Sequence, residues 1–205
     1  GHPSKEDSFL VAVGAMIDAC RRAGVPVLYV CHDGGAGDEL ERGTDGWRVH
    51  CAVAPQAGEI VVDKRFNSAF RQTGLHETLQ SLGAKRIVMC GMQTEFCFDV
   101  SVKVAFELGY DVTVPREAVT TFDSGFAPGE VLTAYFEDRI WDGRYARVLD
   151  TDASSKSLPL ADLFRRARLR GYARASSLTS RFGWYHASQE IGRKGPFSRR
   201  QEERM

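Results

Sequence analysis

The chain has 205 residues, of which 43% are hydrophobic and 26% are charged, proportions that are typical of globular proteins. No apolar run approaches the roughly 18 residues that a membrane-spanning helix needs, and no signal-peptide pattern opens the sequence. The five cysteines include no CxxC pair, which argues against a disulfide framework and a zinc knuckle. We therefore expect a reducing, cytoplasmic compartment.

Charge divides the sequence into two unlike parts. Residues 1–155 carry 15 Lys and Arg against 23 Asp and Glu, whereas residues 156–205 carry 12 against 4. We expect one domain over 1–153 and a basic C-terminal extension over 154–205, helical or partly disordered, with a short amphipathic helix at 158–170. Arginine runs without a recognised binding fold are weak evidence for nucleic acid. A solvated tail, or a helix packed on the acidic domain, is favoured.

Apolar runs and turn residues predict alternating helices and strands along the first 150 residues. In chain order they are a helix over 8–23, strands over 25–31 and 60–63, a helix over 75–82, a strand over 86–91, a helix over 97–108, a strand over 110–114, a helix over 130–141 and a strand over 146–149. This alternation indicates right-handed βαβ units and a parallel sheet with helices on both faces. In such sheets ligands bind beyond the carboxyl ends of the strands.

Cys97 lies where the expected strand over 86–91 passes into the helix over 97–108. The unpaired N–H groups and the dipole at a helix N-terminus favour a thiolate, and the same groups can stabilise an oxyanion. The alternative is a small buried hydrophobic side chain, the usual state of a free cysteine. For Cys31 and Cys90, inside apolar strands, we favour that alternative.

Lys64 ends the short strand that contains Val61-Val-Asp-Lys64. Because the carboxyl ends of parallel strands meet at one edge of the sheet, its ammonium could reach Cys97 and stabilise a thiolate. A lysine at a strand end is also often simply solvated, so its position alone leaves both interpretations open.

These residues occur together with a wider pattern. Lys64, the turn Gly91-Met-Gln-Thr-Glu-Phe-Cys97 and the segments 105–114 and 117–123 resemble the isochorismatase-like cysteine hydrolases. This superfamily includes nicotinamidases, N-carbamoylsarcosine amidases, ureidoacrylate hydrolases and streptothricin hydrolases. The resemblance runs from about residue 8 to residue 152, and the segment Gly43-Thr-Asp-Gly-Trp47 is similar to the members related to streptothricin hydrolase.

The resemblance implies a three-layer, Rossmann-like α/β fold and a hydrolase that acts on a C–N bond of a small amide, lactam or ureido compound. Cys97 would attack the carbonyl carbon and form a thioester, and Lys64 would stabilise the thiolate. A cis peptide bond between Met92 and Gln93 would turn an N–H group toward the oxyanion, with the N–H of Cys97 as the second donor. The chemistry implied needs no cofactor.

One part of the family pattern does not occur in this sequence. In the family, an aspartate follows an N-terminal strand that lies in the middle of the sheet, whereas this sequence passes from Gly1 directly into the first helix. We therefore expect the strands beside that place to lack a hydrogen-bonding partner, and Cys97 and Lys64 to lack the aspartate. The alternative function is a catalytically impaired member that acts as a binding or scaffold subunit.

A metal site is weakly supported, because only His32, Asp33 and His50 fall near the family's metal-binding positions. We therefore expect no metal. Family members usually assemble, so we expect a homo-oligomer that binds a small-molecule substrate, and neither a membrane nor nucleic acid. The candidate walls of the substrate pocket are Trp47, Phe66, Glu95, Phe96 and Phe122.

Overall fold

The computed structural model describes residues 2–150 and, for the backbone, residues 182–187. The helices and helical turns are α1 (Glu6–Ala23), η1 (Cys51–Val53), α2 (Leu75–Ser81), η2 (Thr94–Phe98), α3 (Asp99–Glu107), η3 (Arg116–Ala118), α4 (Gly129–Tyr135) and η4 (Phe136–Trp141). The strands are β1 (Val27–His32), β2 (Ile60–Lys64), β3 (Arg86–Gly91), β4 (Asp111–Pro115), β5 (Arg147–Leu149) and β6 (Phe182–Ala187). The expected α/β class is confirmed.

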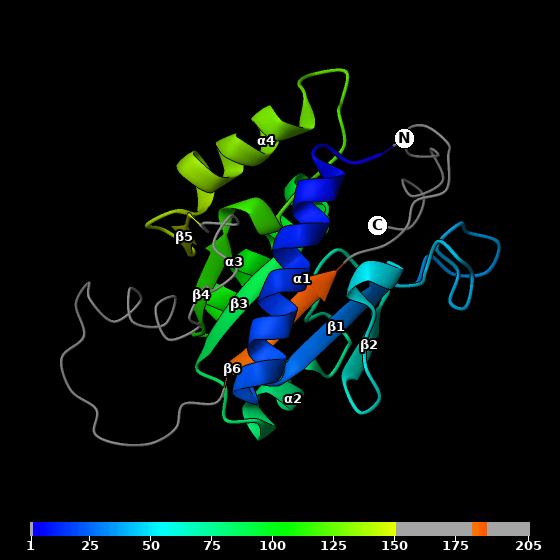
Figure 1. Ribbon diagram of the computed structural model, residues 1–205, viewed down its shortest axis with the longest axis vertical. Helices are drawn as coiled ribbons and strands as arrows, with labels where there is room; N and C mark the ends of the chain where they lie inside the picture. Colours follow the sequence, from blue (N-terminus) through cyan, green and yellow to red (C-terminus); the bar gives the residue numbers. More distant parts are fainter. Residues whose placement is uncertain (1, 151–181, 188–205) are drawn as a thin grey trace.

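All six strands form one parallel sheet in the order β2-β1-β6-β3-β4-β5. Helices cover both faces of this sheet. Val13 and Ile17 of α1 pack with Tyr29 of β1 on one face. On the other face, α2 and α3 pack against the alternate strand residues, as Leu79 and Val102 do. The result is the three-layer arrangement that alternating strands and helices favour (Figure 1).

The centre of the sheet contradicts the expectation of strands without partners. Strand β6, drawn in orange in Figure 1, lies between β1 and β3 and runs parallel to both. Its pairing with β3 extends from Phe182 opposite Arg86 to Ala187 opposite Gly91. A segment from the basic extension therefore occupies the place where the sequence predicts a gap. The division into a domain over 1–153 and an extension over 154–205 stays a prediction, and the helix expected at 158–170 lies outside the described residues.

Local sequence explains the element boundaries. Helix α1 ends at Gly24, which has a φ of 65° and donates its N–H to the carbonyl of Arg21, as a glycine C-cap does. Strands β1 and β3 are buried on both faces and therefore read as continuous apolar runs in the sequence. No helix in the described ranges is both long and apolar enough to cross a bilayer.

Candidate active site

The carboxyl edge of the sheet brings Lys64 and Cys97 together. Lys64 is the last residue of β2 and is only 2% exposed. Its Nζ donates hydrogen bonds to Cys97 Sγ at 3.0 Å and to the carbonyl oxygen of Phe66 at 3.1 Å, and it lies 3.1 Å from His32 Nδ1. The two side chains that the sequence singles out for catalysis are thus in direct contact.

The burial of Lys64 has an electrostatic consequence. A buried ammonium needs nearby anions or strongly polar acceptors to offset the hydration that it loses. Within the described ranges its hydrogen-bonding partners include no carboxylate, and of the three only the Cys97 thiol becomes an anion by losing a proton. The contact therefore places the ammonium against the sulfur, the strongest nucleophile among the three partner atoms.

The backbone around Cys97 differs from the predicted helix start. The peptide bond between Met92 and Gln93 is cis, at the position where the resemblance places one. A π-helical turn, η2, then runs from Thr94 to Phe98, so Cys97 lies inside this turn and α3 begins two residues later. The hydroxyl of Ser101 donates to the carbonyl oxygen of Cys97 at 2.6 Å and fixes the turn against α3.

The other strand and helix cysteines lie in apolar surroundings, as the sequence predicts for Cys31 and Cys90. Burial raises the pKa of the Cys31 thiol to about 12, and it also raises the pKa values of Cys20 and Cys90. Cys97 is half-buried instead, and Cys51 is exposed. Cys97 also accepts a hydrogen bond from the ammonium of Lys64.

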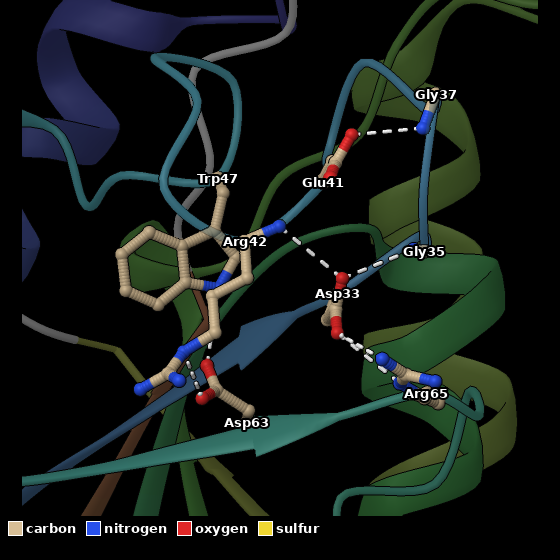
Figure 2. Close-up of polar contacts among 8 residues, drawn as sticks. All are labelled: Asp33, Gly35, Gly37, Glu41, Arg42, Trp47, Asp63 and Arg65. Atoms are coloured by element: carbon tan, nitrogen blue, oxygen red, sulfur yellow. Dashed lines mark hydrogen bonds and ion pairs between the residues drawn. The ribbon is translucent and has the colours of Figure 1, made fainter.

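A loop over residues 33–48 is fastened to the ends of β1 and β2 (Figure 2). Asp33 accepts hydrogen bonds from the guanidinium of Arg65 at 2.9 and 3.1 Å and from the N–H groups of Gly35 and Arg42. These bonds hold the pKa of the Asp33 carboxyl below its usual range, the N–H of Gly35 having the largest effect. The loop is therefore held by a charged residue that follows β1.

Trp47, one of the expected pocket walls, belongs to this fastened loop. Its indole N–H donates to Asp63 Oδ1 at 3.1 Å, and Arg42 pairs with the same carboxylate at 2.8 Å (Figure 2). Asp63 directly precedes Lys64, so the indole is anchored to the strand that carries the Lys64 ammonium.

The remaining expected wall residues lie on three segments. Phe66 touches the site through its carbonyl oxygen, and the guanidinium carbon of Arg71 lies 3.9 Å from the centre of its ring. Glu95 and Phe96 belong to the π turn; Phe96 is 37% exposed, and Glu95 Oε2 is buried without a partner among the described residues. Phe122 is half-buried in the loop before α4. Their role in substrate binding stays a prediction.

No cluster of three His, Cys, Asp or Glu side chains suited to a metal occurs in the part of the chain that the structure describes. The three residues near the family's metal-binding positions make other contacts. His32 faces Lys64, Asp33 pairs with Arg65, and His50 Nδ1 accepts the N–H of Ala52.

Sequence reasoning missed two side chains that contact Cys97. Asn67 Oδ1 lies 3.6 Å from the sulfur, and Ser101 links the carbonyl of Cys97 to the N–H of Ala69. The segment after Lys64 places Asn67, and the pattern contains nothing that distinguishes it from an ordinary loop residue. The sequence suggests a role for His32 only as a metal ligand, because its contact with Lys64 depends on the pairing of β1 with β2.

The chain is similar in sequence to a known protein domain and to known hydrolases. The isochorismatase domain matches residues 2–131. A streptothricin hydrolase of Streptomyces noursei is 34% identical over 55% of this chain and 41% of its own length, less than two thirds of that relative. Nicotinamidase 3 of Arabidopsis thaliana is 28% identical over 69% of this chain and 75% of its own length.

Solved structures agree with these matches. An isochorismatase from Pseudomonas putida has a TM-score of 0.66 and 28% identity, covering 75% of this chain and 79% of its own. The N-carbamoylsarcosine amidase of Thermoplasma acidophilum has a TM-score of 0.58 and 26% identity, covering 71% and 83%. With more than half of its residues matched to the domain, the chain belongs to the isochorismatase family.

Proposed function

We propose that this protein is a cysteine hydrolase that cleaves the C–N bond of a small amide, lactam or ureido compound through a thioester at Cys97. The observation that carries the proposal is the 3.0 Å contact between the buried ammonium of Lys64 and Cys97 Sγ. The names of the relatives, streptothricin hydrolase and nicotinamidase, agree with hydrolysis of a C–N bond.

The contacts support a mechanism in which a thioester forms at Cys97 and is then hydrolysed, with Lys64 giving up a proton and taking one back. The Cys97 thiolate adds to the carbonyl carbon, and backbone N–H groups of Gln93 and Cys97 donate hydrogen bonds to the oxyanion that forms. The C–N bond then breaks, and the leaving nitrogen takes a proton from the Lys64 ammonium. A water molecule attacks the thioester and gives its proton to the Lys64 amine, which releases the acid and restores the ion pair.

Alkylation by iodoacetamide tests the activated thiolate, and exposed Cys51 serves as an internal reference. We expect Cys97 to be labelled faster than Cys51 at pH 6–7, because the proposed mechanism needs a reactive sulfur and the Lys64 ammonium lies against it. Lys64→Met keeps an unbranched side chain, shorter by the terminal nitrogen, and removes the charge, so it should abolish this difference. Equal labelling of Cys97 and Cys51 in the unmodified protein would refute the proposal.

Turnover is tested separately with a panel of small amides, lactams and ureido compounds. We expect ammonia or amine release and an acyl adduct on Cys97 that mass spectrometry detects after rapid acid quenching. Cys97→Ala is the matched control, and it should give neither product nor adduct.

A second candidate function is a binding or scaffold subunit without turnover. The observation that favours it is the absence of a carboxylate among the hydrogen-bonding partners of Lys64 in the described residues, since general acid–base assistance contributes about 10²–10⁴-fold. This function predicts compounds that raise the melting temperature and are recovered unchanged. Product formation that depends on Cys97 would exclude it.

A further inference from the structure

Strand β1 ends in a histidine whose ring contacts the lysine that ends β2. His32 and Lys64 are register partners in the parallel pairing of the two strands, and His32 Nδ1 lies 3.1 Å from Lys64 Nζ. The next residues, Asp33 and Arg65, form an ion pair of their own at 2.9 Å. Successive side chains along a strand alternate between its faces, so the two strand ends present two separate cross-strand pairs.

The contact with His32 completes the hydrogen bonding of the ammonium. A lysine ammonium has three N–H donors, and three atoms lie within hydrogen-bonding distance of Lys64 Nζ, namely His32 Nδ1, the carbonyl oxygen of Phe66 and Cys97 Sγ. When two of the donors are directed to the His32 ring and to the carbonyl oxygen of Phe66, the third donor points to the sulfur of Cys97.

We infer that His32 is a positioning residue, which accepts a hydrogen bond at Nδ1 and thereby aims the Lys64 ammonium at Cys97. The inference rests on the proposed function for the chemistry of the thiolate. It adds to the pair of Lys64 and Cys97 a neutral acceptor, in a site whose described residues offer the ammonium no carboxylate.

The charges around His32 agree with a neutral ring. Burial and, to a smaller extent, the Lys64 ammonium lower the pKa of His32 to about 4, while Asp38 and Asp33 oppose this effect. Asp33 is itself paired with Arg65. Above pH 4 the ring is therefore uncharged and Nδ1 can accept. Below pH 4 both ring nitrogens carry protons, so the ring repels the ammonium and its contact with the thiolate is lost.

Labelling of Cys97 in the full chain, relative to Cys51, tests the inference between pH 4 and 8. His32→Asn keeps an acceptor close to the position of Nδ1 and does not titrate, whereas His32→Leu removes the acceptor. We expect His32→Leu to slow labelling at pH 6 on the order of tenfold and His32→Asn to stay close to the unmodified protein. The unmodified protein should also lose reactivity near pH 4 through a step that His32→Asn lacks.

Arg65→Gln is the matched control, because it breaks the neighbouring cross-strand pair and leaves the contact between His32 and Lys64. It should be labelled like the unmodified protein. If His32→Leu is labelled as fast as the unmodified protein, or if His32→Asn is slowed as much as His32→Leu, the inference is overturned.

A spectroscopic measurement on the unmodified protein decides the question even if a variant does not fold. Long-range ¹H–¹⁵N spectra should find Nδ1 of His32 unprotonated and Nε2 protonated from pH 5 to pH 8, and a proton on Nδ1 overturns the inference. The two proposals fail differently. Slow labelling of Cys97 with an unprotonated Nδ1 refutes the nucleophile and keeps the hydrogen bond from Lys64 to His32.

Discussion

Lys64 and Glu137 are buried titratable side chains that differ in how far hydrogen bonds replace the hydration that each loses on burial. Lys64 has an acceptor for each of its three N–H donors. Glu137 is 3% exposed and accepts a hydrogen bond from Arg116 at 2.9 Å, while its Oε1 finds no partner among the described residues. Burial outweighs the attraction of Arg116 and raises the pKa of Glu137 to about 8.

This carboxyl group should make stability depend on pH. Its folded pKa of about 8 exceeds the ordinary glutamate value of 4.5, so between these values the folded state binds more protons than the unfolded state. The stabilisation is complete below pH 4.5 and is lost as the pH rises through 8. We expect the urea midpoint to fall from pH 5 to pH 8.5, and Glu137→Gln to fall less. Parallel curves for the two proteins would contradict this account.

At the scale of elements, the start of α4 is fitted closely to the loop that contains Phe122. A Cβ added at Gly129 would lie 2.7 Å from the carbonyl oxygen of Thr121 and 3.0 Å from the backbone of Phe122. The N–H of Gly129 also donates to Asp123 Oδ1 at 2.8 Å. Only a residue without a side chain allows this approach.

Gly129→Ala should therefore destabilise the protein by about 1–3 kcal/mol, the usual effect of forcing a group into packed surroundings. Gly125→Ala is the matched control in the same loop, since a Cβ there would have no atom within 4 Å and needs no left-handed backbone. We expect this control to leave the free energy of unfolding nearly unchanged in urea titrations. Equal effects of the two substitutions would show that backbone contact at Gly129 is not the cause.

Much of the element order could be predicted because buried parallel strands leave a clear trace in the sequence. The runs over 25–31 and 86–91 are apolar on both faces and match β1 and β3 within two residues at each end. The π-helical turns η2 and η4 could not be predicted in the same way. They differ from an α-helix in hydrogen-bond register and not in the spacing of apolar residues.

The residues of the candidate site also differ in whether a local sequence pattern identifies them. Cys97 and Lys64 could be found because each occupies a recognisable place, one after a strand and turn and the other at a strand end. His32, Asn67 and Ser101 could not be assigned roles, since each is defined by a contact across at least four residues of sequence and by no local pattern.

For the whole molecule, the decisive feature is the strand that joins the two halves of the sheet. Without β6, the sheet would consist of β2-β1 and β3-β4-β5, with unpaired edges on β1 and β3. The sequence did not predict β6, because the six residues Phe182–Ala187 include a glycine and follow a stretch rich in Ser and Arg. Only pairing with distant strands defines it.

A proline in β6 tests this arrangement. In a central strand each N–H donates to a neighbouring strand, so Tyr185→Pro removes a ladder hydrogen bond and imposes its ring on the sheet. We expect this variant to unfold at a markedly lower urea concentration than Tyr185→Ala, which keeps the N–H. Coincident unfolding curves for the two variants would show that β6 is not required in the sheet.

The position of β6 also bears on how the protein folds while it is being made. The ribosome completes β5 at Leu149 and reaches Phe182 only 33 residues later, which takes roughly 2–7 s at ordinary rates of synthesis. During this interval β1 and β3 lack the hydrogen-bonding partner that β6 supplies, and open strand edges bind other chains readily. Newly made molecules should therefore depend on molecular chaperones until the bridging strand arrives.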